Sequence, residues 1–188
     1  AFALEGELER GARLAALELI VERHEALRTR FYEHAGQLCQ RIDPPGPLAL
    51  EERDLRGETE TVQALADAHA ARAFDLIEGP LLRVQLLRLD EQRWRLQIVC
   101  HHIVSDGWSM QRFIGEFAAA YAAFAEGRTA QFAPLPLQYA DYAQWQRDWL
   151  KSSEATRQLD YWKARLGEHQ PLLELPTDHP RPAHGSRQ

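Results

Sequence analysis

The sequence predicts an α/β fold in which helices pack on a mixed β-sheet. Strand-like and helix-like patterns alternate along the chain, and one segment has the two-residue periodicity of a β-hairpin. In addition, 45% of the 188 residues are hydrophobic, so the chain can bury a core of its own.

The first part of the chain predicts a strand, a helix and two short strands. Residues 2–8 alternate between apolar and polar side chains, and apolar residues at helical spacing predict a helix from Arg10 to His24. Two strands are expected at Leu27–Tyr32 and Gln37–Ile42, around a turn-prone His-Ala-Gly sequence. The proline-rich residues 43–47 are expected to be irregular, because proline lacks a backbone donor.

The middle of the chain contains the clearest hairpin. A helix is expected at Thr61–Phe74, ending before Gly79-Pro80. Apolar and polar side chains then alternate along Leu82–Leu86 and again along Trp94–Cys100, which predicts two antiparallel strands with one apolar face each. A further helix is expected at Trp108–Glu126.

The last predicted helices are rich in aromatic residues. They span Gln138–Leu150 and Glu154–Leu166, after a Pro-Leu-Pro break. Their aromatic side chains recur at helical spacing, which predicts core positions rather than a ligand cage for Tyr142, Trp145, Trp149 and Trp162.

Composition excludes several classes of function. The formal net charge of -6 argues against a surface that grips phosphate backbones. The longest apolar run, residues 118–125, is too short to cross a bilayer and has no flank typical of a signal peptide, so the cytoplasm is the expected compartment. Cys39 and Cys100 lack any paired or zinc-binding spacing and are expected to be reduced core thiols.

One polar cluster stands where a predicted strand ends and a helix begins. His101, His102 and Asp106 lie there, and histidine is the natural general base near neutral pH. Asp106 would orient a histidine or pair with an arginine. The alternative is a polar turn in which Asp106 caps the next helix. A zinc site is disfavoured, because adjacent histidines point to opposite sides of a strand.

Three motifs, in order, resemble those of nonribosomal peptide synthetase condensation domains. Residues 101–107, His-His-Ile-Val-Ser-Asp-Gly, resemble the family's HHxxxDG motif. Residues 23–31 resemble its RHExLRTxF motif, and residues 139–145 resemble its YxDYAxW motif. This resemblance implies a chloramphenicol acetyltransferase-like sandwich, one lobe of a two-lobed, V-shaped domain. Residues 1–170 would form the N-terminal lobe, and residues 171–188 a Pro-rich link towards a C-terminal lobe.

The resemblance also implies roles for individual residues. His102 matches the residue usually assigned to catalysis, and His101 would support it. Asp106 would be structural, through a salt bridge to Arg28. The backbone amide of Gly107 would lie near the reacting thioester. The start of the following helix, Trp108 and Ser109, would line a substrate channel.

The implied activity is amide formation between a donor acyl or peptidyl thioester and an acceptor aminoacyl thioester. The motif sequences resemble domains that join an L-configured donor to an L acceptor. No metal and no directly bound cofactor is expected, because carrier domains bring the phosphopantetheine arms. The expected partners are upstream and downstream carrier domains, an adenylation domain and the C-terminal lobe. A starter-type N-acyltransferase with a fatty acyl donor and a catalytically silent docking module remain alternatives, and the isolated segment is expected to be inactive.

Overall fold

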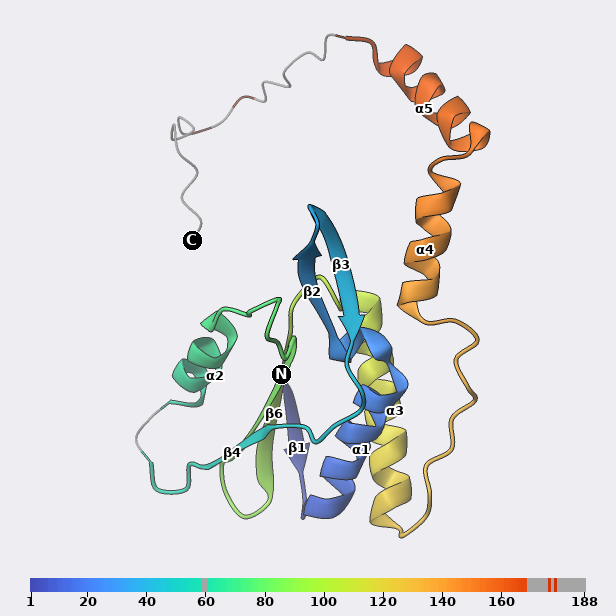
Figure 1. Cartoon of the computed structure of the whole chain (residues 1–188). Helices are drawn as coiled ribbons and strands as arrows, with labels where there is room; N and C mark the ends of the chain where they lie inside the picture. The colour runs from blue at the N-terminus through green and yellow to red at the C-terminus, as the bar shows by residue number, and fades with distance from the viewer. Residues whose placement is uncertain (59–60, 169–175, 177, 179–188) are drawn as a thin grey trace. The chain divides into compact units, whose positions relative to one another are not determined.

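A computed structural model of the chain describes residues 1–58, 61–168, 176 and 178 (Figure 1). Its contacts group into two compact units, Ala1–Tyr142 and Ala143–Gln188. All the predicted site residues belong to the first unit. The boundary predicted between residues 170 and 171, and the Pro-rich link, lie outside the described residues except for 176 and 178.

The first unit is built on a mixed four-stranded sheet, as predicted. Its strand order is β1-β6-β5-β4, with β4 parallel to β5 and the other neighbours antiparallel. The strands are β1 (Phe2–Glu5), β4 (Leu50–Asp54), β5 (Leu82–Arg88) and β6 (Arg93–Cys100).

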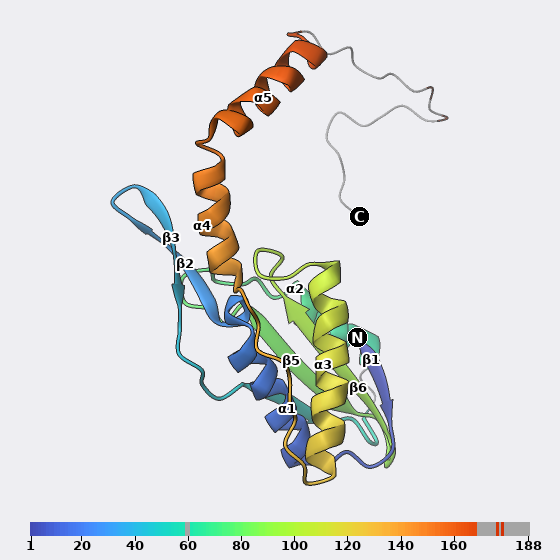
Figure 2. The ribbon, with the colours of Figure 1, turned by 90° about the vertical axis from the view of Figure 1, so that its right-hand side faces the viewer.

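Helices cover both faces of this sheet (Figure 2). Helices α1 (Arg10–Arg23) and α3 (Gly107–Ala125) lie side by side on one face, and α2 (Val62–Ala71) packs on the other. The predicted bounds of these three helices agree with the structure to within three residues at each end. Thr61 accepts a hydrogen bond from the backbone of Ala64 and so caps α2 at the start that the sequence predicts.

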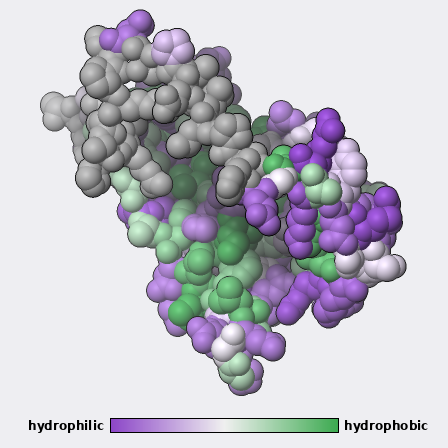
Figure 3. Space-filling view, turned by 90° about the horizontal axis from the view of Figure 1, so that it is seen from above, coloured by the Kyte–Doolittle hydropathy of each residue, from purple (hydrophilic) through white to green (hydrophobic). Residues whose placement is uncertain are grey.

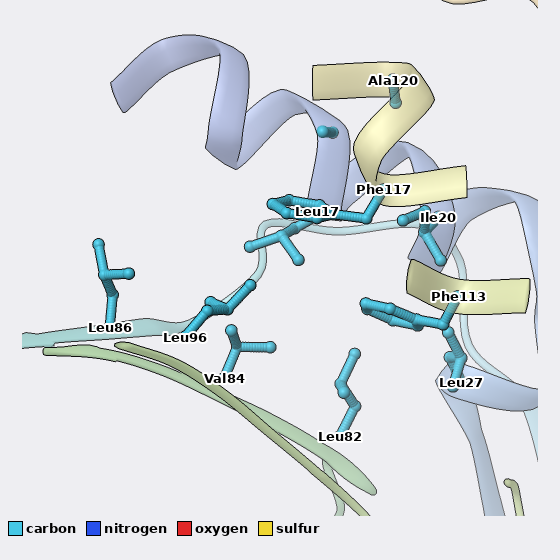
Figure 4. Packing of buried hydrophobic residues seen from close by; sticks show 11 residues of the cluster. Leu17, Ile20, Leu27, Leu82, Val84, Leu86, Leu96, Phe113, Phe117 and Ala120 are labelled. Carbon is cyan, nitrogen blue, oxygen red and sulfur yellow. The ribbon is translucent and has the colours of Figure 1, made fainter. Parts of the chain in front are cut away.

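The face under α1 and α3 carries the main core. Even-numbered positions of β5 point into it, where Val84 and Leu86 meet Leu17, Ile20 and Phe117 (Figure 4). These side chains are at most 7% exposed. Burying each of them fully contributes about 1.5–3 kcal/mol, so this face provides most of the apolar stabilisation of the first unit.

The face under α2 is more polar. Gln85 of β5 is paired in register with Gln97 of β6, so both side chains point towards α2. The amide Nε2 of Gln97 donates to the backbone oxygen of Ala66 at 2.8 Å. His69 of α2 is 3% exposed, and neither of its ring nitrogens has a hydrogen-bond partner among the described residues.

Arg83 fastens the end of α2 to the sheet. Its guanidinium donates to the backbone oxygens of Arg72 at 2.6 Å, Ala73 at 3.1 Å and His69 at 3.3 Å, and its Cζ lies 3.9 Å from the centre of the Phe74 ring. A cation among the last carbonyl groups of a helix satisfies acceptors that have no partner within the helix.

Two segments differ from the prediction. Leu27 and Arg28 belong to the 3₁₀ turn η1 (Glu25–Arg28) rather than to a strand, because the backbone amide of Leu27 donates to His24. The predicted pair of strands therefore begins later, as β2 (Thr29–His34) and β3 (Gln37–Ile42), which form a separate two-stranded ribbon. Strand β4 was not predicted, because its Leu-Glu-Glu-Arg-Asp sequence lacks an apolar alternation; it is an exposed edge strand.

The predicted aromatic helices form, as α4 (Tyr139–Trp149) and α5 (Ser153–Leu166). Tyr142, Trp145 and Trp162 are 43%, 57% and 56% exposed, so the predicted core positions are wrong for these three. Trp149 is half-buried and stacks on Trp145 with 6.3 Å between ring centres. Helical spacing places the apolar side chains on one side of a helix, but they are buried only where another element packs against that side.

Exposed apolar residues of the molecule are visible as green areas among purple ones (Figure 3).

Within the described ranges, no helix combines the length and the hydrophobicity needed to cross a bilayer.

Candidate functional site

The polar cluster lies on the turn between β6 and α3. Strand β6 ends at Cys100, paired in register with Leu82, and the backbone amide of His101 donates to the oxygen of Leu81 at 3.0 Å. Helix α3 begins at Gly107. The six residues between strand and helix are therefore held at both ends by regular structure.

His101 is part of the framework of this turn. Its Nδ1 accepts a hydrogen bond from the backbone amide of Ile103 at 3.0 Å. Its ring also meets Phe74 edge-on, with 5.8 Å between ring centres and 88° between planes. Both contacts fit the supporting role that the resemblance implies for His101.

His102 has a different environment. It is exposed and makes no hydrogen bond to another described residue. It lines a pocket of about 450 Å³ together with side chains from η1, α3 and the segment before α4. The other residues that line this pocket are His24, Ala26, Leu27, Ile103, Val104, Ser105, Asp106, Trp108, Ser109, Arg112, Phe113, Leu135, Leu137, Gln138 and Tyr139. An imidazole with free nitrogens at a pocket wall can accept a proton from a bound nucleophile.

Asp106 caps helix α3. Its Oδ1 accepts hydrogen bonds from the backbone amide of Ser109 at 2.8 Å and from the Ser109 hydroxyl at 2.7 Å. These bonds hold the pKa of Asp106 below its usual value. The capping alternative for Asp106 is therefore confirmed.

The expected salt bridge between Arg28 and Asp106 is wrong for this structure. Arg28 Nη1 donates to the backbone oxygen of Asp43 at 2.6 Å, and Nη2 lies 3.5 Å from Glu25 Oε1. The guanidinium is thus directed at the 3₁₀ turn and the start of the proline-rich loop. Asp106 is meanwhile committed to the two donors of Ser109.

The start of α3 contributes the remaining predicted residues. A Cβ built on Gly107 would meet no atom within 4 Å, so the space beside its backbone is open to a ligand. Trp108 is 84% exposed and lines the pocket. Ser109 also lines it, but its hydroxyl is engaged by Asp106.

Most of the residues that line the pocket were not predicted as site residues, among them the polar residues His24, Arg112 and Gln138. The side chain of His24 is held by α3, since its Nε2 lies 2.6 Å from Oε2 of Glu116. The motif at residues 23–31 was the available signal for His24; the sequence carries none for a partner 92 positions away.

Cys100 offers no nucleophile beside the histidines. Its thiol is free, and burial raises its pKa to about 11, so the thiolate is scarce at neutral pH. Among the described residues, no group of three or more His, Cys, Asp or Glu side chains is arranged to hold a metal ion.

Comparison with known families decides the family of the chain. The sequence profile of the family described as "Condensation domain" matches residues 1–188. The chain belongs to this family. The predicted fold, a chloramphenicol acetyltransferase-like lobe of a condensation domain, is thereby confirmed, as is the resemblance drawn from the three motifs.

Relatives of this condensation domain are large synthetases. It is 45% identical over 185 residues to a protein of the linear gramicidin synthase of Brevibacillus parabrevis, covering 96% of this chain and 4% of that protein. It is 47% identical over 186 residues to chondramide synthase cmdD of Chondromyces crocatus, covering 96% and 5%. The chain thus spans about one-twentieth or less of the length of these relatives.

A solved structure shares the fold of this condensation domain. The complex of the X-domain and OxyB from teicoplanin biosynthesis matches with a TM-score of 0.83 at 33% identity, covering 96% of this chain and 40% of that one.

Proposed function

We propose that this lobe supplies the general base of an amide-forming condensation domain, and that His102 is that base. The observation that carries the proposal is the His102 side chain on the wall of the pocket of about 450 Å³, where it makes no hydrogen bond to another described residue. In the neighbouring His101, the ring nitrogen Nδ1 accepts a hydrogen bond from the backbone of Ile103. His101 would therefore stabilise the turn, and His102 would carry out the proton transfer.

The reaction joins two acyl groups that arrive as thioesters. The amine of the acceptor attacks the donor carbonyl, a C–N bond forms, and the C–S bond of the donor thioester breaks. His102 accepts the proton that the amine loses, and that proton can return to the departing thiolate. The backbone beside Gly107 leaves open space in which its amide can approach the developing oxyanion.

The proposal extends to partners and substrates. Carrier domains on either side would bring both thioesters on phosphopantetheine arms, so the lobe would need no cofactor of its own. An adenylation domain would load the acceptor, and a C-terminal lobe would complete the site. The motif sequences favour an L donor joined to an L acceptor, in the cytoplasm. Loading the donor carrier with a fatty acyl group instead tests the starter-type alternative.

The test uses the synthetase that contains this chain, with both carriers loaded and amide product measured by mass spectrometry. His102→Ala is expected to lower the rate by about 10²–10⁴-fold, the usual contribution of a general base. The matched control is His34→Ala, at an exposed position of the β2–β3 ribbon, which should leave the rate unchanged. Circular dichroism should show both variants folded. Undiminished product from a folded His102→Ala variant contradicts the role of His102.

A second function is supported by one comparison. The X-domain that matches at a TM-score of 0.83 was solved in complex with OxyB, so a protein that contains this fold can bind another protein. If loaded wild-type synthetase forms no amide, this docking function replaces the enzymatic one. We further expect the 188 residues alone to form no amide; product from this segment by itself contradicts that expectation.

A further inference from the structure

A buried carboxylate outside the pocket lies among two arginines and a histidine. Glu116 of α3 has a side chain that is 9% exposed. Its Oε2 lies 2.6 Å from His24 Nε2 and 3.4 Å from Arg23 Nε, and its Oε1 lies 3.8 Å from Arg112 Nη1. Burying a carboxylate costs several kcal/mol unless charges and hydrogen-bond donors compensate, so these partners are what make its position tolerable.

This carboxylate joins two helices at a defined point. Arg23 is the last residue of α1 and His24 is its C-cap. Glu116 is on α3, about two and a half turns after Gly107, where the helix begins. The apolar contacts between α1 and α3 tolerate sliding and rotation, whereas a hydrogen bond between two defined atoms does not. Glu116 therefore fixes the end of α1 against α3.

The partners of Glu116 form part of the pocket. His24 and Arg112 both line it, while Glu116 is not among the lining residues. Gln138, another lining residue, donates from Nε2 to the backbone oxygen of Arg23 at 3.0 Å and accepts from the amide of Glu25 at 3.2 Å. Fixing Arg23 and His24 therefore also fixes Gln138 and the part of the pocket wall just before α4.

The same helix carries the catalytic turn. Asp106 caps α3, and His102 lies four residues before that cap, on the turn that runs into the helix. Because Glu116 is part of α3, its bond to His24 fixes the position of the pocket wall relative to the turn that carries His102. Loss of that bond would release the wall while leaving His102 and its turn chemically intact.

We propose that Glu116 is a positioning residue for the condensation reaction, which acts by holding His24 and Arg112 on the pocket wall. This inference rests on the proposed function. Misplacing bound groups by about 1 Å costs up to about 10²-fold in rate, because reacting atoms must meet in a narrow range of geometries. Glu116 does not touch the substrate, so its loss should reduce kcat and leave the KM for the loaded carriers unchanged.

The test measures kcat and KM for amide formation by the synthetase carrying Glu116→Gln, which keeps the size of the side chain and removes its charge. We expect kcat to fall at least tenfold at unchanged KM. Glu116→Asp keeps the charge and should restore part of the loss, which a purely space-filling role would not predict. The matched control is Glu126→Gln, which breaks an exposed pair with Arg128 just after α3 and should behave as wild type.

Hydrogen exchange gives a second readout that needs no turnover. In Glu116→Gln, the amides of Glu25 and Gln138, which donate to Gln138 Oε1 and Asp141 Oδ2, should exchange faster, while those of β5 keep the wild-type rate. Unchanged exchange with unchanged kcat overturns the proposal. Equal acceleration in β5 also overturns it, because the loss is then global destabilisation. If wild-type synthetase makes no amide, the proposed function fails, and the exchange result still decides whether Glu116 holds the wall.

Discussion

The two faces of the central sheet are built by different means. Among the described residues, eleven buried apolar side chains fill the layer under α1 and α3, whereas the apolar cluster under α2 has three, Leu55, Leu65 and Leu87. The remainder of the α2 face is filled by His69, Gln85 and Gln97, and Arg83 ties down its edge. One strand, β5, serves both faces through alternate residues.

This difference separates two ways of holding a helix. Apolar burial on the α1/α3 face is strong and insensitive to pH, and the turn that carries His102 leads directly into that face. Polar contacts on the α2 face fix the orientation of α2, but they leave buried nitrogen and oxygen atoms of this face without hydrogen-bond partners among the described residues. The site is therefore supported by the more robust layer, and α2 should be the part of the sheet's cover that opens first.

Adjacent leucines on β5 provide the largest contrast. Leu86 and Leu87 are 1% and 0% exposed and point to opposite faces. We expect Leu86→Ala to cost about 3–5 kcal/mol and Leu87→Ala about 2–3 kcal/mol, because a cavity in the larger dry cluster loses more contacts. Native-state hydrogen exchange of the β5 amides measures both. Equal costs would show that the two layers are equally well packed.

Removing the guanidinium of Arg83 should have a smaller effect, confined to one face. Arg83→Met loses three hydrogen bonds to the end of α2 and should lower the stability of α2 by about 1–3 kcal/mol, the value of charge-assisted bonds. Arg83→Lys keeps the charge without the planar fork and should fall between. Exchange of α2 amides should accelerate while that of α1 stays unchanged. Matching acceleration in α1 would mean that the two layers unfold together.

The smallest expected effect concerns pH. Burial lowers the pKa of His69, and Arg83 and Arg72 lower it further while Glu51 opposes them. The unfolded imidazole, with a pKa near about 6.5, then binds a proton more readily than the buried one. The stability of α2 is complete above that pH and falls as pH decreases below it, by at most about 1.4 kcal/mol per unit.

His69→Leu removes the titrating group and provides the control. The measurement is the exchange of α2 amides between pH 7.5 and 5.5, corrected for the intrinsic pH dependence of exchange. The wild type should lose protection towards low pH and the variant should not. Parallel curves for the two proteins would show that His69 binds its proton equally well in the folded and unfolded states.

Sequence patterns predicted the parts of the fold whose burial repeats. The alternation in Leu82–Leu86 and Trp94–Cys100 predicted both strands and their two faces. Strand β4 was not predicted, because an edge strand with four exposed residues needs no apolar alternation. The site followed the same logic: its position at a strand end predicted His102, whereas the bond from His24 to Glu116 joins helices that no local spacing relates.

The salt bridge expected between Arg28 and Asp106 failed for a related reason. Family resemblance supplied both residues but could not supply their competitors. Ser109 offers two donors within one helical turn of Asp106, and Glu25 lies three residues before Arg28 with its Oε1 3.5 Å from Arg28 Nη2. Local partners are reached with little loss of chain entropy, so they prevail over a distant one.

The hydrogen bond from Ile103 to His101 also sets a spectroscopic difference between two identical neighbouring residues. Because Nδ1 of His101 accepts, a neutral ring must carry its proton on Nε2, whereas none of the described residues forms a bond that selects a tautomer for His102. The imidazole ¹⁵N signal of His101 therefore serves as an internal standard, and that of His102 serves as a probe of the pocket. A variant that disturbs the turn shifts both signals, while a ligand that enters the pocket shifts only the second.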